Sequence, residues 1–146
     1  ICAAEASEKG SGEMRDQQDL ISDFVNHRVW AVVGASHDPR KFGYQVFRSL
    51  RDAGYSVYPV NPKGGELEGA KVYRSLADLP QPPEVINMVV PPAVTERVVR
   101  EAHELGITRV WMQPGAESEA AITYCEEHDI QAIYDACAMV WKRDWH

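Results

Sequence analysis

Short apolar runs alternate with amphipathic segments along most of the chain. The run at residues 29–33, VWAVV, is continuous and ends at Gly34, which is typical of a strand buried on both faces of a sheet. In the segment 42–53 apolar residues recur at helical spacing, and Gly54 follows at a position that commonly ends a helix. Four more runs repeat the strand pattern, at 56–60, 85–90, 109–112 and 131–134. Strands that alternate with helices form βαβ crossovers, which build a parallel sheet.

We therefore predict an α/β, Rossmann-like fold: a five-stranded, mostly parallel sheet in the order 3-2-1-4-5, with helices on both faces. The helices are expected at 16–27, 42–53, 75–79, 94–105 and 117–128. In this order the winding reverses between strands 1 and 4, so a crevice is expected between their carboxyl tips, residues 34–36 and 113–115. The tips of strands 2 and 3 would lie along the same edge. An α/β protein binds its ligand at that edge.

Length, charge and cysteine content limit the classes of protein that this chain can belong to. Its 146 residues, 45% of them hydrophobic, suit one domain, which we expect at residues 15–146. Residues 1–14 are expected to be a disordered tail or an expression remnant. A net charge of −7 argues against nucleic-acid binding, and no apolar run approaches the ~20 residues that span a bilayer. Three cysteines without CxxC spacing predict no disulfide framework and no zinc site, and they favour a cytoplasmic location.

The loop between the first strand and the next helix has the composition of a phosphate site. Gly34 would let the backbone turn tightly and approach a ligand, and the helix that follows offers free N–H groups. Ser36 adds a hydroxyl group, and Arg40 and Lys41 add positive charge. The full GxGxxG motif is absent. The alternative is that Gly34 only closes a turn and that both cations are solvated.

The end of strand 2 bears on the kind of nucleotide that would bind. Proteins that hold NAD usually place a carboxylate there, but this chain has Asn61-Pro62-Lys63. A lysine favours a ribose with an extra phosphate, as in NADP or coenzyme A; the alternative is an ordinary turn lysine in a loop rich in Pro and Gly. The segment VPP at 90–92 forms a rigid apolar corner suited to a pantetheine arm or an adenine face; alternatively, it simply stops the strand.

Five segments occur in a fixed order that resembles a known family. They are VVGAS (32–36), KFGYQV (41–46), GYSVYPVNPK (54–63), VVPP (89–92) and VWMQPGAES (110–118). On these segments the chain resembles the stand-alone coenzyme A-binding proteins, whose fold matches the N-terminal domain of the succinyl-CoA synthetase α subunit and of ADP-forming acyl-CoA synthetases. The resemblance implies a Rossmann-like fold that holds coenzyme A (CoA) or an acyl-CoA.

The resemblance also implies which residues would contact CoA. Those on the diphosphate side would be Gly34, Ala35, Ser36, Lys41 and Gly43. Those facing the adenosine and its 3′-phosphate would be Asn61, Pro62 and Lys63, and those along the pantetheine would be Val90, Pro91, Met112, Gln113 and Pro114. Members of the family often end in Asp-Arg-Cys, whereas this chain has Asp135-Ala136-Cys137 and lacks that arginine.

No catalytic residue and no metal site is predicted. The five histidines show neither HxxxH nor HExxH spacing, and the GxSxG and GxxxxGK[ST] motifs are absent. We therefore predict a CoA-binding module that is not an enzyme; the alternative is an NADP-dependent reductase or an NADP-binding sensor. Cys137 is either an inert core residue or a thiol that forms a mixed disulfide with CoA. The expected partner is a small-molecule ligand, without nucleic acid or membrane, and the sequence leaves open a homo-oligomer or a partner subunit.

Overall fold

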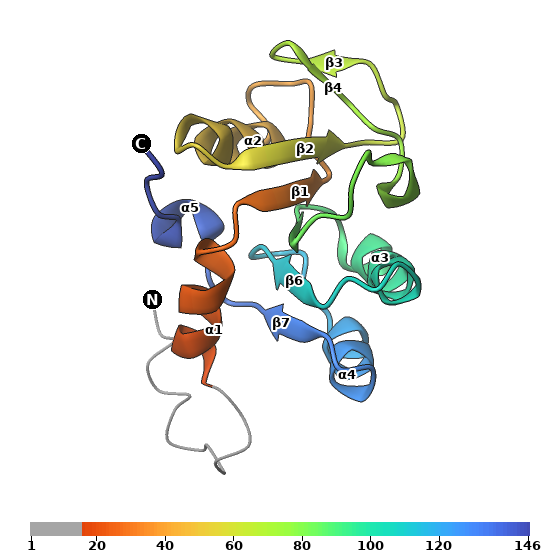
Figure 1. Cartoon of the computed structure of the whole chain (residues 1–146). Coiled ribbons are helices and arrows are strands. Elements are labelled where there is room, and N and C mark those ends of the chain that lie inside the picture. Colours follow the sequence, from red (N-terminus) through yellow and green to blue (C-terminus); the bar gives the residue numbers. More distant parts are fainter. Residues whose placement is uncertain (1–15) are drawn as a thin grey trace.

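The computed structural model describes residues 16–146, and its centre is a parallel sheet of five strands. Figure 1 shows this sheet with helices packed against it. The strands are β1 (Val29–Val33), β2 (Ser56–Val60), β5 (Val85–Met88), β6 (Arg109–Met112) and β7 (Gln131–Ile133). Their order across the sheet is β2-β1-β5-β6-β7, and every neighbouring pair is parallel. The predicted α/β class and parallel sheet are confirmed. The predicted tail, residues 1–14, lies outside the described residues.

The strand order differs from the predicted 3-2-1-4-5. The third long strand, β5, pairs with β1 and β6 and not with β2, so the order is 2-1-3-4-5 in chain numbering. Apolar runs do not specify which neighbour a buried strand takes, and the connection between β2 and β5 is long enough to cross over β1. As a result the winding reverses between β1 and β5, and the crevice expected between strands 1 and 4 is instead placed at the ends of β1 and β5.

Helices cover both faces of this sheet, as predicted. One face carries α1 (Gln17–Val25), α2 (Phe42–Asp52) and the short α5 (Ala138–Trp141), and the other carries α3 (Pro92–Glu104) and α4 (Glu119–Glu127). Side chains of β1 alternate between the two cores: Trp30 and Val32 face the first, Ala31 and Val33 the second. All four are buried. This continuous burial explains why the strand reads as an unbroken apolar run.

Several connections differ in detail from the sequence-based expectation. The loop after β2 contains a small antiparallel hairpin, β3 (Glu66–Leu67) and β4 (Ala70–Lys71), which was not predicted. The helix expected at 117–128 begins only at residue 119, because the Ser118 hydroxyl caps it by accepting a hydrogen bond from the Ala121 N–H. The helical stretch expected at 75–79 is a single 3-10 turn, Leu76–Asp78. No helix among residues 16–146 is long and apolar enough to cross a bilayer.

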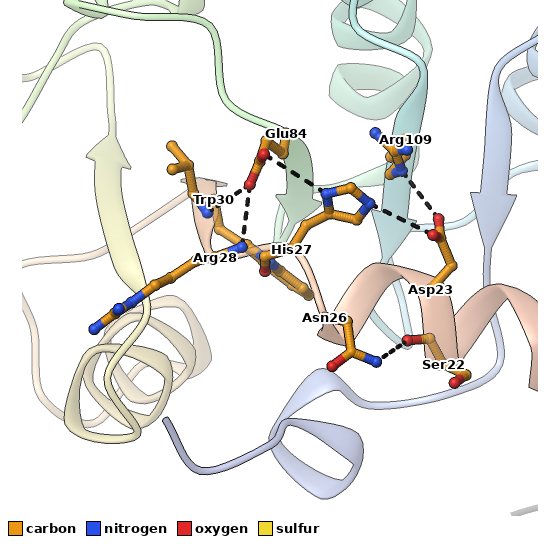
Figure 2. Close-up of polar contacts among 9 residues, drawn as sticks. Ser22, Asp23, Asn26, His27, Arg28, Trp30, Glu84 and Arg109 are labelled. Carbon is orange, nitrogen blue, oxygen red and sulfur yellow. Dashed lines mark hydrogen bonds and ion pairs between the residues drawn. The ribbon is translucent and has the colours of Figure 1, made fainter. Parts of the chain in front are cut away.

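At the amino-end edge of the sheet, a chain of polar side chains connects α1 to the strands (Figure 2). The Glu84 carboxylate accepts hydrogen bonds from two backbone N–H groups at the start of β1, and its other oxygen lies 3.6 Å from His27 Nδ1. His27 Nε2 lies 3.5 Å from the Asp23 carboxylate, which also accepts a hydrogen bond from Arg109. Within this chain of side chains, each carboxylate has a hydrogen-bond donor of the protein as its partner. This edge is therefore a structural joint, and the opposite edge carries the candidate site.

Candidate functional site

At the carboxyl-end edge, the ends of four strands are joined by hydrogen bonds. The Gly34 N–H donates to the carbonyl oxygen of Val60 at 3.0 Å, which joins the ends of β1 and β2. The Val89 N–H donates to Val33 at 2.8 Å and joins the end of β5 to that of β1. The Asn61 side-chain amide donates to the Ala35 carbonyl oxygen at 2.7 Å. The Gln113 N–H donates to the Met88 carbonyl oxygen at 3.0 Å and joins the end of β6 to that of β5, so all four predicted strand tips are connected.

Two glycines allow the first turn of α2 to lie on the end of β1. Gly34 has a φ of +100°, and a Cβ there would stand 2.1 Å from the Val89 carbonyl oxygen. A Cβ on Gly43 would stand 2.0 Å from the Gly34 carbonyl oxygen. No side chain among residues 16–146 caps this helix, whose first turn holds no acidic residue. Its free N–H groups and the positive end of its dipole thus lie beside the glycine bend, in a position suited to an anion.

The loop between β1 and α2 also contains an ion pair that the sequence analysis missed. Both nitrogens of the Arg40 fork donate to the Asp38 carboxylate, at 3.1 and 3.0 Å. This hydrogen bonding holds the pKa of Asp38 below its ordinary value and raises that of Arg40. The Ser36 hydroxyl accepts the Asp38 N–H at 3.1 Å, so its own proton can still be donated to a ligand. The sequence did contain a signal for this ion pair, namely an acidic residue two positions before an arginine within a turn.

At the end of β2, Asn61 has a structural role and Lys63 is free to meet a ligand. The Asn61 side chain accepts the Lys63 N–H at 2.9 Å, in addition to its bond to the β1 loop, so both ends of the amide are used within the protein. Pro62 and Lys63 are exposed. Within residues 16–146 no carboxylate pairs with Lys63, nor with Lys41 at the start of α2. Lys63 and Lys41 therefore bring positive charge to this edge, and the charge of Lys41 also helps to lower the pKa of Asp38.

The end of β5 supplies an apolar wall. Val90 is half-buried, and one of its methyl groups lies 2.7 Å from where a Cβ of Gly34 would be. Pro91 is exposed, and Pro92 occupies the first turn of α3, where a missing N–H costs no hydrogen bond. The corner predicted from VPP thus adjoins the glycine bend.

The end of β6 is less accessible than the other three. Met112 and Gln113 are fully buried, and of the three residues predicted here only Pro114 is exposed. The Gln113 side chain accepts hydrogen bonds from the buried Asn87 amide at 3.2 Å and from the Ala138 N–H at 2.8 Å. It also donates to the sulfur of the half-buried Cys137 at 3.3 Å. Met112 and Gln113 thus support the strand end from inside, one strand further from β1 than the predicted order would place them.

A comparison with known protein families matches residues 28–143 to the CoA-binding domain model. The chain belongs to the CoA-binding domain family. The resemblance found in its sequence motifs is confirmed. Among residues 16–146, no group of three or more His, Cys, Asp or Glu side chains could hold a metal ion.

Curated relatives of this CoA-binding domain protein include parts of larger enzymes. It is 38% identical, over 92 residues, to the α subunit of ADP-forming acetate–CoA ligase II of Pyrococcus furiosus, a match that covers 62% of this chain and 20% of that protein. The chain thus spans about a fifth of the length of this relative. It is also 32% identical to the uncharacterized protein YneT of Bacillus subtilis, over 75% of this chain and 82% of that one.

Solved structures of similar proteins share the fold. A conserved hypothetical protein from Pyrococcus furiosus is 43% identical, with a TM-score of 0.75 over 77% of this chain and 97% of that one. An acetyl-coenzyme A synthetase of Candidatus Korarchaeum cryptofilum, solved with phosphate and ADP, is 28% identical with a TM-score of 0.65. The match covers 77% of this chain and 26% of that enzyme. The domain thus occurs both as most of a short chain and as one part of a synthetase.

Proposed function

We propose that this protein binds CoA or an acyl-CoA at the carboxyl-end edge of its sheet, as a binding module without chemistry of its own. The observation that carries the proposal is the start of α2 above Gly34, which no side chain of the described residues caps, with Lys41 at the helix start and exposed Lys63 at the end of β2. The diphosphate would lie against the loop after β1, where Ser36 and the first-turn N–H groups can donate to it. The proposed contacts are Gly34, Ala35, Ser36, Arg40, Lys41 and Gly43.

The residues at the ends of β2 and β5 fit the remaining parts of CoA. No carboxylate stands at residues 61–63, so a phosphorylated ribose would meet Lys63 and not a negative charge. The apolar corner at Val90 and Pro91 suits the pantetheine arm, with exposed Pro114 further along the edge. The backbone of Asn61 and Pro62 would lie next to the adenosine. The hydrogen bonds of the Asn61 side chain would keep this turn and the loop after β1 in place.

NADP is the second candidate ligand, because the lysine at the end of β2 would bind its ribose phosphate equally well. Isothermal titration calorimetry with CoA, dephospho-CoA, NADP and NAD separates the two. We expect CoA to bind most tightly, with a clear loss of affinity when its 3′-phosphate is removed. Tight binding of NADP without any response to CoA would overturn the proposal.

The family relationship extends this proposal to partners. Because the α subunits of ADP-forming acetate–CoA ligases contain this domain, the protein would act either as a carrier or sensor of CoA or as a subunit that presents CoA to a partner. Mass spectrometry of ligand that co-purifies with the protein would identify an acyl group. Free CoA alone would support the carrier or sensor role.

A further inference from the structure

A cavity of about 400 Å³ opens beside the end of β2, outside the residues predicted from the sequence. It is lined by the two glycines that follow Lys63 and by Lys71, Tyr73, Arg74 and Asp78. Its size is at the lower end of small-molecule sites. The lining carries two cations and one carboxylate, and the Asp78 carboxylate already accepts a hydrogen bond from Ser75 at 3.2 Å.

The backbone fixes the segment that carries Arg74 beside β2. The Tyr73 N–H donates to the Pro59 carbonyl oxygen at 2.9 Å, and the Asn61 N–H donates to that of Tyr73 at 2.8 Å. This short parallel bridge places Tyr73 beside Val60, the last residue of β2. Arg74 is therefore held in register with the turn that contains Lys63.

One nitrogen of the Arg74 guanidinium donates a hydrogen bond that orients the group, and its other nitrogens have no partner within the described part of the chain. Its Nη1 donates to the Pro62 carbonyl oxygen at 3.0 Å, and a Cβ on Gly64 would stand 3.1 Å from its Nε. Gly64, with a φ of +65°, thus leaves the room in which the guanidinium lies. Within the described part of the chain, Nε and Nη2 have no hydrogen-bond or ion-pair partner. Two donors of a planar fork remain for a ligand, which is the geometry that suits a phosphate group.

The cavity adjoins the proposed diphosphate loop. The imidazole Nε2 of His37, in the loop between β1 and α2, lies 3.4 Å from where a Cβ of Gly65 would be. A nucleotide with its diphosphate on that loop and its adenosine toward β2 would therefore bring its ribose phosphate to this cavity. Lys71, whose ammonium lies 5.1 Å from the Tyr73 ring, stands on the same lining.

We propose that this cavity is the subsite for the ribose 3′-phosphate, and that Arg74 is a specificity-determining ligand of that phosphate together with Lys63, with Lys71 adding charge. This inference rests on the proposed binding of CoA, and it adds Arg74 and Lys71, which the sequence motifs did not include, to Lys63, which they did. Asp78 opposes the phosphate, so its removal acts in the opposite direction to the removal of Arg74.

Calorimetric titration with CoA and with dephospho-CoA tests the subsite. Arg74→Ala is expected to weaken CoA about tenfold or more while leaving dephospho-CoA within about twofold, because a charge-assisted bond to the phosphate is lost. Arg74→Lys should restore part of the affinity, and Asp78→Asn should tighten CoA alone. Arg100→Ala, an equal change of charge on α3, is the control and should not separate the two ligands.

Three results would overturn the proposal. In the first, Arg74→Ala weakens the binding of CoA and dephospho-CoA equally; in the second, it weakens the binding of neither. In the third, the unaltered protein binds CoA and dephospho-CoA with the same affinity. In each of these cases CoA binding stands without this subsite. If the unaltered protein binds neither ligand, the proposed function itself fails. Circular dichroism of each variant confirms that the compared proteins are folded.

Discussion

The carboxylate of Asp38 holds the guanidinium of Arg40 through two hydrogen bonds, inside the loop where the ligand phosphates are expected. The pair is exposed, with 89% of the Arg40 side chain and 30% of the Asp38 side chain accessible. Its negative member stands close to the proposed diphosphate position. The loop therefore carries less positive charge toward a ligand than its sequence indicates.

Replacing Asp38 with Asn should raise the affinity for CoA by about two- to tenfold, since it frees Arg40 and removes a repelling charge. Asparagine keeps the side-chain oxygen that accepts the Arg40 N–H, so the turn is preserved. Asp52→Asn, with the same charge change at the far end of α2, is the control. Equal effects of the two variants in calorimetry would show that only net charge matters.

Gly34→Ala should destabilise the fold far more than Gly69→Ala. Both glycines have positive φ, +100° and +81°, but a Cβ at Gly69 meets nothing within 4 Å, whereas one at Gly34 collides with the Val89 carbonyl oxygen. Backbone strain alone costs about 1–2 kcal/mol, and the collision adds to it. Urea denaturation measures the difference. Similar unfolding free energies would mean that the end of β5 does not press on Gly34 as described.

Lys63→Ala should weaken CoA strongly and dephospho-CoA little, because Lys63 is exposed and no carboxylate within residues 16–146 competes for it. The loss expected for one charged hydrogen bond is about tenfold. Lys142→Ala, on the C-terminal segment, serves as a control of equal charge. An equal loss of affinity for both ligands would show that Lys63 does not contact the 3′-phosphate.

The joint at the amino-end edge should make stability depend on acid pH. The backbone N–H of Val29, followed by the nearby His27, holds the pKa of Glu84 below its ordinary value of 4.5 (Figure 2). A carboxyl whose pKa is lowered by folding stabilises the protein above its ordinary pKa, and the contribution is lost as the pH falls through the lowered value. Thermal unfolding between pH 7 and pH 3 should therefore show a smaller decrease for Glu84→Gln than for the unaltered protein. Parallel curves would exclude this role.

The sequence predicted the elements of this fold better than their arrangement. The bounds of β1 and β6 and the end of α2 before Gly54 follow from local apolar spacing and turn chemistry, and the structure has them where they were predicted. The position of β5 beside β1 depends on contacts between strands about 50 residues apart, which no local pattern encodes. For this reason β6 was predicted beside β1, whereas the strand beside β1 at the reversal of the winding is β5.

The candidate site shows the same division. Gly34, Ser36 and Lys63 could be proposed from the sequence because their residue types match what a phosphate loop and a strand end require, and their contacts with a ligand stay a prediction. Asp38 and Arg74 were missed, since their importance comes from the groups that they face: a neighbouring arginine and a carbonyl oxygen brought near by the bridge after β2. Gln113 looked like a contact in the motif, but its side chain is fully buried and bonded to Asn87 and Ala138.

The most direct test of the account is a titration of ¹⁵N-labelled protein with CoA, followed by amide chemical shifts. If CoA binds at the carboxyl-end edge, the largest changes should fall on the amides of residues 34–43 and 61–65, with those of 23–29 and 84 unchanged. Changes concentrated at the amino-end edge, or an unaltered spectrum at saturating CoA, would contradict it.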